Sequence, residues 1–245
     1  MARPPRLTCA GQAHHLLQKG IDHQPIFRDD DDHLQFLRWL LEAARQFKVN
    51  IHAYVLMPDH LHLLATPPDQ NGLGRMVQWV GRHYVPYFNR KYGRSGTLFQ
   101  GRFKAAVLEA ELNLLNCMHY IESNPVRAGL VGSADAFRWS SYAHHVGIEA
   151  DAVVTDHLMY WSLGNTPFQR EAFYRIQMDQ ALSPEMIKEL TAAVLTCRVM
   201  GTPAFQATCE KLVGRPVGSR TRGRPPKCPE QISAAACAQL KPKSS

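Results

Sequence analysis

The sequence lacks the cysteine patterns of two common kinds of small domain. Structural zinc sites need closely spaced cysteine ligands, and small secreted domains need a dense set of disulfides. The cysteines of this chain stand far apart, and no two of them form a C-x-x-C pair. We therefore expect neither a zinc ribbon nor a disulfide scaffold, and a reducing cytoplasm suits the chain. The cysteines are Cys9, Cys117, Cys197, Cys209, Cys228 and Cys237.

Long apolar runs are missing as well. A membrane-spanning helix needs roughly 18 or more consecutive apolar residues, and no stretch of this sequence approaches that. The N-terminal run MARPPRLTCAGQAHH also lacks the apolar centre of an export signal. We therefore expect a cytoplasmic chain that neither spans nor binds a membrane.

Negative charge is scarce relative to positive charge. Asp and Glu number 21 against 28 Lys and Arg, which gives a formal net charge of +7 at pH 7. Such a surplus favours a polyanionic partner, such as nucleic acid or an anionic membrane surface. Because no segment indicates a membrane, nucleic acid is the expected partner. The hydrophobic share of 45% is enough for a substantial core.

The order of the hydrophobic patterns predicts an α/β fold. Four aspartates at 29–32 precede a helical pattern, where carboxylates stabilise the positive end of the helix. Two apolar stretches are divided at Met57-Pro58-Asp59, which indicates a hairpin. We expect an antiparallel sheet with helices on one face, a ferredoxin-like or RRM-like α/β sandwich. The predicted elements are a strand at 14–18, a helix at 34–44, a hairpin at 51–66, a helix at 73–88, a strand at 97–107 and a helix at 112–123.

Composition divides the chain into three predicted parts. Residues 1–145 contain the α/β pattern, and residues 146–213 form a helical appendage. Within that appendage Ser183 and Thr202 each stand before a proline, as helix caps do. Residues 214–245 are rich in Arg, Pro, Gly and Lys, which predicts a basic, flexible tail.

His60 and His62 are candidate metal ligands. Residues two apart on a strand project from the same face, with Cα atoms roughly 7 Å apart, so one ion can contact both imidazoles. Leu61 and Leu63 point the other way, into the core. An H-x-H pair also arises by chance, so an ordinary core role for both histidines stays open until a third ligand is found.

The helix predicted at 112–123 offers two further candidates. Its helical spacing buries Leu114, Leu115, Met118 and Ile121 and places Asn113, Asn116, Tyr120 and Asn124 on the opposite side. The carbonyl oxygen of Asn124 suits a hard cation and lies one turn beyond Tyr120. A half-exposed tyrosine and a helix-terminating asparagine are the plain alternatives.

Three motifs in order resemble one family. The runs YVLMPDHLHLL (54–64), YGRSGTLFQGRFKA (92–105) and YIESNPVRAGLV (120–131) resemble the IS200/IS605-type tyrosine transposases, and more specifically their REP-associated branch. The resemblance spans residues 6–145 and extends more weakly beyond them. It departs from the family in HHLLQKG (14–20), where Lys19 replaces an expected arginine, and in the following IDHQ.

The resemblance implies a complete reaction. His60 and His62, with Asn124 assisting, would hold a divalent ion, Mg²⁺ or Mn²⁺, and Tyr120 would be the nucleophile. The enzyme would be a DNA strand transferase and endonuclease that cuts single-stranded or hairpin DNA through a 5′-phosphotyrosine and then rejoins it. It would work in the bacterial cytoplasm, at the nucleoid when bound to DNA.

Basic residues near these motifs are candidate DNA contacts. Arginine and lysine bind phosphates and guanine edges, although each one alone is as readily a solvated surface charge. The tail contains Gly-Arg-Pro twice, a pattern suited to the minor groove. The candidates are Arg82, Arg90, Lys91, Arg94, Arg102, Lys104 and Arg127, together with Arg222 and Arg224 in the tail.

Other functions remain open on the sequence. The same fold could serve a non-cleaving, sequence-specific DNA-binding regulator, although both histidines, Tyr120 and Asn124 are all present. A metal-dependent phosphodiesterase would need more carboxylates or a second histidine motif near the metal. A metal-free tyrosine recombinase or topoisomerase would need an arginine-rich phosphate clamp in place of the H-x-H pair. The sequence leaves open a monomer or a homodimer, and whether the tyrosine serves its own chain or a partner's.

Overall fold

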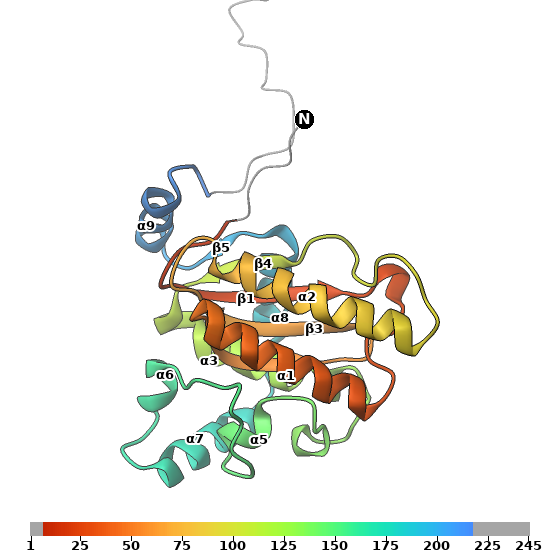
Figure 1. Cartoon of the computed structure of the whole chain (residues 1–245). Helices are drawn as coiled ribbons and strands as arrows, with labels where there is room; N and C mark the ends of the chain where they lie inside the picture. The colour runs from red at the N-terminus through yellow and green to blue at the C-terminus, as the bar shows by residue number, and fades with distance from the viewer. Residues whose placement is uncertain (1–6, 218–245) are drawn as a thin grey trace, which may run out of the picture.

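The computed structural model describes residues 7–217 of the chain (Figure 1). Its first part runs in the order strand, helix, hairpin, helix, strand and helix, as the sequence predicted. These elements are β1 (Ala13–Lys19), α1 (Asp30–Phe47), β2 (Asn50–Leu56), β3 (His60–Thr66), α2 (Gly72–Lys91), β4 (Lys104–Leu108) and α3 (Ala110–Glu122), with a 3-10 turn, η1 (Ile21–His23), after β1.

The second part is mostly helical. It contains α4 (Asn124–Arg127), η2 (Ala134–Ala136), α5 (Tyr142–His145), α6 (Leu158–Trp161), α7 (Pro167–Asp179), α8 (Pro184–Thr196), β5 (Val199–Met200) and α9 (Pro203–Val213). The predicted caps are confirmed, because the Ser183 and Thr202 side chains accept hydrogen bonds from backbone N–H groups of α8 and α9. None of the helices between residues 7 and 217 is long and apolar enough to cross a membrane.

The strands form one sheet in the order β2-β3-β1-β4-β5. The first four pair antiparallel, with the β-α-β-β-α-β topology expected of a ferredoxin-like sandwich. β5 adds a short parallel strand beside β4, so the sheet is mixed. At the other margin, β2 forms isolated bridges with Val154 and Ser140 from the segments beyond α4.

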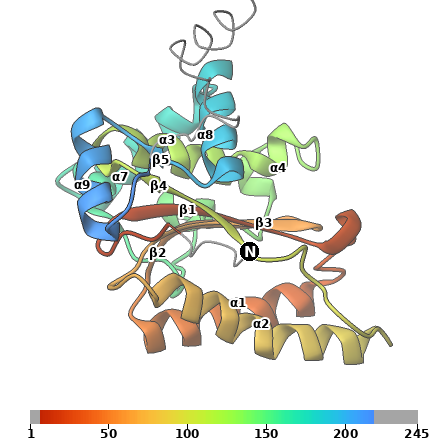
Figure 2. The same cartoon turned by 90° about the horizontal axis from the view of Figure 1, so that it is seen from above.

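The α/β class and the C-terminal helices are confirmed, but helices cover both faces of the sheet. Figure 2 shows α1 and α2 on one side and α3 with α8 on the other. Alternate residues of each strand enter separate core clusters: Leu16 and Leu63 pack against α1 and α2, whereas Leu17 and Leu64 pack against α3 and α8. Local sequence patterns did not predict this second helical layer, because α8 lies far along the chain from the strands that it covers.

The second helical layer joins the predicted parts of the chain. Met118 and Ile121 of α3 share one buried cluster with Leu190 and Val194 of α8. The core therefore continues across the predicted boundary at 145/146. A cluster at the margin of the sheet likewise joins Cys9 near the N-terminus to Cys209 of α9.

Local chemistry explains two element boundaries near the site. The Asp29 side chain accepts a hydrogen bond from the Asp32 N–H at 3.0 Å, so the acidic run caps α1 as predicted. The strand predicted at 97–107 is shorter, because Gly101 adopts φ +64° and residues 97–103 form a loop. That loop still enters the core through the buried Leu98 and Phe103.

Gly20 fixes the turn that follows β1. A Cβ atom at this position would lie 2.2 Å from the backbone oxygen of Gln24, which leaves no room for a side chain. The Gly20 N–H donates to the backbone oxygen of Asp59 at 2.7 Å. The absence of a side chain therefore lets the turn close against the residue that precedes His60.

Candidate active site

The predicted metal ligands lie on one face of β3, as the sequence indicated. His62 stands in the middle of the sheet, opposite Leu17 of β1 and Val55 of β2. His60 begins the strand, opposite Lys19. His62 is buried and His60 half-buried, and their ring centroids are 5.3 Å apart. The two imidazoles thus lie side by side on the face that α3 and α8 cover.

One ring nitrogen of each imidazole lies within hydrogen-bonding distance of a neighbouring side chain. His60 Nδ1 lies 2.6 Å from Asp59 Oδ1, and His62 Nδ1 lies 2.7 Å from His15 Nε2. Within residues 7–217 neither Nε2 atom has a hydrogen-bond partner. Metal-binding histidines typically use one ring nitrogen for a neighbouring acceptor and the other for the metal. The pair therefore fits a divalent ion bound through both Nε2 atoms.

Burial sets the charge of these groups. It lowers the pKa of His62 well below its ordinary value, and the charges of His15, His60 and Arg127 lower it further. Burial raises the pKa of Asp59, but the hydrogen bond and the charge of His60 outweigh it and leave that pKa below its ordinary value. Only a neutral imidazole binds a metal, so His62 has the required charge state at neutral pH.

His15 belongs to the same cluster, and the sequence reasoning missed it. It is completely buried on β1, with its ring centroid 4.9 Å from that of His62. Burial, and then the charge of Arg127, lowers the pKa of His15 to about 3, so the ring is neutral. Its Nδ1 atom is buried and has no hydrogen-bond partner among residues 7–217. The signal that could have found His15 is the pairing of β1 with β3, which places odd-numbered β1 residues beside His62.

Tyr120 brings the predicted nucleophile into this cluster. Its ring centroid lies 5.7 Å from that of His62 and 5.5 Å from that of His15, both edge to face. The Arg127 guanidinium lies 4.3 Å from the ring centroid. Tyr120 is only 7% exposed, because the second helical layer covers the side of α3 that the sequence left open. A single chain thus places the phenol against the H-x-H pair.

The Tyr120 hydroxyl contacts the second helical layer directly. It lies 3.0 Å from Thr191 Oγ1 of α8. Asn113, which the sequence also placed on the open side of α3, is buried against β5, where its amide lies 3.5 Å from the Met200 carbonyl. Leu114, Met118 and Ile121 are buried as predicted, and Leu115 is partly buried.

Asn124 is the first residue of α4 and is half-buried. Its carboxamide makes no hydrogen bond to residues 7–217. In the same part of the chain, no group of three or more His, Cys, Asp or Glu side chains could hold a metal ion. His15 does not complete such a group, because its Nε2 atom faces His62 Nδ1. A third ligand would therefore have to be a different kind of group, as the amide of Asn124 is.

Some of the residues that we predicted to contact DNA lie at this site. Arg127 covers the Tyr120 ring and donates to Ser123 Oγ at 2.5 Å. Lys104 and His62 both stand opposite Leu17, on its two sides, so all three share one face of the sheet. Lys19, which pairs with His60, also lowers the pKa of His62 through its charge. The cluster is therefore flanked by positive charge.

The remaining predicted contacts are dispersed. Lys91 is bound to the acids that cap α1, with Nζ 2.7 Å from Asp29 Oδ1 and 3.0 Å from Asp32 Oδ1. Arg94 is half-buried over the Phe88 ring. Arg82 and Arg90 are exposed on α2, Arg102 lies in the loop before β4, and Arg222 and Arg224 lie outside the described residues.

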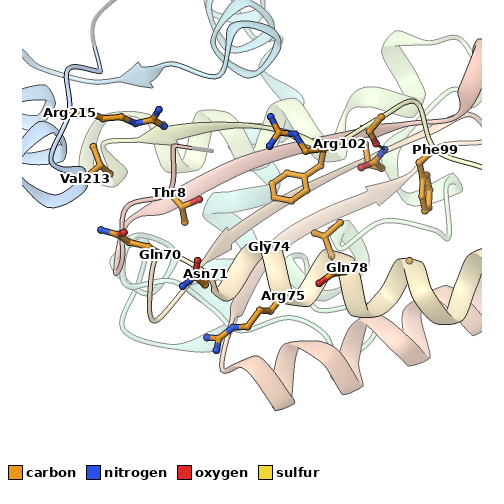
Figure 3. A pocket seen from close by; sticks show the side chains of 15 residues that line it. Thr8, Gln70, Asn71, Gly74, Arg75, Gln78, Phe99, Arg102, Val213 and Arg215 are labelled. Carbon is orange, nitrogen blue, oxygen red and sulfur yellow. Dashed lines mark hydrogen bonds between the residues drawn. The ribbon is translucent and has the colours of Figure 1, made fainter. Parts of the chain in front are cut away.

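Arg102 lines an open groove of about 820 Å³ (Figure 3). One wall comes from the loop before β4, with Phe99 and Arg102, and the other from α2, with Arg75 and Gln78. The described residues that line the groove include no carboxylate. Gln18 also lines it, and since Gln18 and His15 point to opposite faces of β1, the groove opens away from Tyr120.

Comparisons with known proteins point to one family. Residues 12–124 match the family model described as Transposase IS200 like. A REP-associated tyrosine transposase bound to a REP hairpin is 16% identical, with a TM-score of 0.49 over 64% of this chain and 93% of that chain. A candidate transposase from Deinococcus radiodurans R1 is 18% identical, with a TM-score of 0.33 over 47% of this chain and 93% of that chain. A search of curated proteins finds no match.

The matched segment contains the residues that the sequence motifs singled out. It includes the H-x-H pair on β3, Tyr120 of α3 and Asn124, and it begins just before β1. The motifs predicted this family, and the match confirms that prediction. Residues 12–124 of this chain are thus similar to the IS200-like transposase family.

Proposed function

We propose that this transposase cleaves and rejoins single-stranded or hairpin DNA, with Tyr120 as the nucleophile. The observation that carries the proposal is the contact of the Tyr120 ring with His62, whose centroids are 5.7 Å apart in one chain. A buried tyrosine beside two imidazoles whose Nε2 atoms have no hydrogen-bond partner among residues 7–217 suits attack on a phosphate. It has no evident purpose in a protein that only binds DNA.

The reaction exchanges one phosphoester for another. Tyr120 Oη attacks the phosphorus of a phosphodiester, the bond from phosphorus to the 3′ oxygen breaks, and the phenol proton is released as the 3′ oxygen takes one up. The phosphorus is then joined to Tyr120 as a 5′-phosphotyrosine. Attack by a second 3′-hydroxyl reverses these steps, so rejoining needs no nucleotide cofactor.

The other side chains around Tyr120 have separate proposed roles in the reaction. A divalent ion, Mg²⁺ or Mn²⁺, when bound by His60 and His62, supplies positive charge to the scissile phosphate. Asn124 is the proposed assisting ligand, because its amide has no other partner among the described residues. Arg127, held over the phenol, places a guanidinium where the phosphate must approach.

The DNA class follows from the family motifs and the distribution of charge. The REP-associated resemblance of the motifs favours a hairpin, and the exposed lysine and arginine side chains around the site favour a single strand that follows them. The groove at Arg102 is the proposed path for flanking DNA on the other face of the sheet. Its arginine and amide groups suit phosphates and base edges, and Phe99 suits stacking.

A covalent adduct tests the proposal. Wild-type protein, a labelled hairpin-bearing single strand and Mg²⁺ or Mn²⁺ should give a protein–DNA adduct that survives denaturing electrophoresis. Tyr120→Phe should give none, and His60→Ala should lower the yield at least tenfold. Tyr142→Phe is the matched control, because the Tyr142 hydroxyl makes no hydrogen bond to residues 7–217.

The outcomes separate the competing functions. An adduct that persists in Tyr120→Phe, or cleavage by wild type without any adduct, contradicts the tyrosine mechanism. Tight hairpin binding with neither cleavage nor adduct supports the non-cleaving regulator instead. Unchanged yield in His60→Ala contradicts the role of the H-x-H pair.

A further inference from the structure

A helix outside the matched family segment reaches the proposed nucleophile. The family match ends at residue 124, whereas α8 begins at Pro184 and contains Thr191. Thr191 Oγ1 lies 3.0 Å from the Tyr120 hydroxyl, which is hydrogen-bonding distance. Figure 2 shows α8 beside α3 on the same side of the sheet.

A second contact of Thr191 fixes the direction of this hydrogen bond. Thr191 Oγ1 lies 2.7 Å from the backbone carbonyl of Ile187, one helical turn earlier, and a carbonyl can only accept. A hydroxyl has a single proton, and that of Thr191 is therefore directed at Ile187. Thr191 accepts the bond from Tyr120, and the Tyr120 hydroxyl donates it.

Core packing holds Thr191 in place. Its neighbours Leu190, Ala193 and Val194 are buried against the sheet and α3. The N-terminus of α8 is capped, because Ser183 Oγ accepts from the Met186 N–H at 3.2 Å. Beyond its C-terminus the chain enters β5, which pairs with β4. The acceptor oxygen is thus fixed relative to α3 and to the strands that carry the histidines.

The contacts of Tyr120 have separate effects. The rings of His15 and His62 pack against the phenol ring and set its plane, and the guanidinium of Arg127 lies over that ring and also interacts, as a donor, with the phenol oxygen. Ring packing leaves rotation of the O–H bond unrestricted, whereas an acceptor of fixed position restricts it. With the proton directed at Thr191, the lone pairs of the phenol oxygen point away from α8.

We propose that Thr191 is a positioning residue for DNA cleavage. It holds the Tyr120 hydroxyl so that an oxygen lone pair is directed at the scissile phosphate. This inference rests on the proposed role of Tyr120 as nucleophile. It also makes α8 a part of the active site, so residues beyond the family match complete the site in this chain.

The test compares two substitutions of Thr191. Thr191→Val keeps the shape and removes the acceptor, so the rate of adduct formation at saturating DNA should fall about five- to tenfold, as expected for one lost neutral hydrogen bond. The Kd for the hairpin should not change. Thr191→Ser keeps the hydroxyl and should restore most of the rate. Thr196→Val is the matched control, because exposed Thr196 makes the same bond to the carbonyl one turn earlier, at 2.6 Å, without contacting Tyr120.

A second measurement tests the hydrogen bond without any DNA. If Tyr120 and Thr191 are hydrogen-bonded, the effects of Tyr120→Phe and Thr191→Val on the free energy of unfolding in urea should not add. The double variant should be no less stable than the less stable of the two single variants. Additive losses contradict the bond. This readout stays informative even if wild type forms no adduct, a result that would contradict the proposed function alone.

The kinetic outcomes decide the role. A wild-type rate in Thr191→Val, an equal loss in Thr191→Ser, or a loss that appears only in DNA affinity each overturns the proposal. A drop in rate matched by Thr196→Val would show a general effect on α8 and also overturn it.

Discussion

At the scale of single residues, the site depends on which nitrogen of each histidine the protein uses. His62 can present Nε2 to a metal only if its Nδ1 carries the proton and donates to His15 Nε2, 2.7 Å away. His15 then acts as an acceptor that fixes both the tautomer and the ring orientation of His62. Asp59 does the same for His60 through a carboxylate.

A pair of His15 variants should separate this role from packing. His15→Phe keeps a ring against Tyr120 but removes the acceptor, so Mn²⁺ affinity measured by calorimetry or by electron paramagnetic resonance should fall about tenfold or more. His15→Gln offers a side-chain oxygen as acceptor and should bind Mn²⁺ more tightly than His15→Phe. Equal affinities in the two variants would contradict the acceptor role.

Two other buried histidines make stability sensitive to acid. Burial lowers the pKa of His14 and of His52 to about 4. His14 donates from Nδ1 to the Gln12 carbonyl and accepts the Cys9 N–H at Nε2, so its neutral ring is fully satisfied. In the unfolded chain these histidines bind a proton near pH 6.5. Each one's contribution to the free energy of unfolding is therefore complete above pH 6.5 and is lost as the pH falls toward 4.

Urea unfolding at several pH values checks this prediction. The free energy of unfolding should fall between pH 6.5 and 4, by up to about 3 kcal/mol for each histidine. His52→Gln should be less stable at neutral pH but should lose less on acidification. If wild type and His52→Gln show the same slope in this range, His52 is not a source of the acid sensitivity.

At the scale of elements, α3 is tied to the later helices by a buried carboxylate. Glu122 is fully buried near the end of α3, and its Oε1 atom accepts hydrogen bonds from Ser141 at 2.5 Å and His145 at 2.7 Å. Its Oε2 atom accepts from the Tyr174 hydroxyl of α7 at 2.7 Å. Since Tyr120 lies two residues earlier, this network also fixes the helix that carries the nucleophile.

Removal of the Glu122 side-chain carboxyl group should lower the free energy of unfolding strongly. Glu122→Ala leaves buried donors without an acceptor, and we expect a loss of about 3–5 kcal/mol in the free energy of unfolding. Tyr174→Phe removes one donor and should cost about 1–2 kcal/mol. Glu149→Ala is the control, because Glu149 is exposed. A loss below about 1 kcal/mol in Glu122→Ala would show that the network contributes little.

Local patterns predicted the elements but not their packing. The hairpin, the caps of α1 and α8 and the buried Leu114, Met118 and Ile121 follow from signals within a few residues. The H-x-H pair and Tyr120 came from motifs. The burial of Tyr120 could not be predicted from local patterns, because it depends on α8, whose Thr191 lies 71 positions further along the chain. His15 was missed for the same reason, since its contact with His62 spans 47 positions.

At the scale of the whole molecule, one chain assembles the H-x-H pair and the tyrosine. We therefore expect cleavage in cis. A mixture of His62→Ala and Tyr120→Phe proteins should form no adduct, since neither chain contains a complete site. Recovery of adduct on the His62→Ala protein in the mixture would show that Tyr120 acts on a partner's site.

The groove on the other face should contribute charge to DNA binding. Arg102→Gln should weaken hairpin binding a few-fold and reduce the salt dependence of the Kd by about one unit of slope. Arg38→Gln is the matched control, because Arg38 is exposed on α1 and pairs with Glu42. Fluorescence anisotropy at several salt concentrations measures both. Equal slopes in the two variants would place the DNA elsewhere.

At both margins of the sheet, other segments of the chain pair with part of the edge strand. β5 pairs with β4 at one margin. At the other, the Leu56 N–H donates to the Trp139 carbonyl at 2.9 Å and the Tyr54 carbonyl accepts the Ser141 N–H at 3.1 Å. Little free backbone is left there to template another strand. If two copies of this transposase associate through their sheet edges, the described residues leave only the short stretch of β4 before Val107 for such pairing.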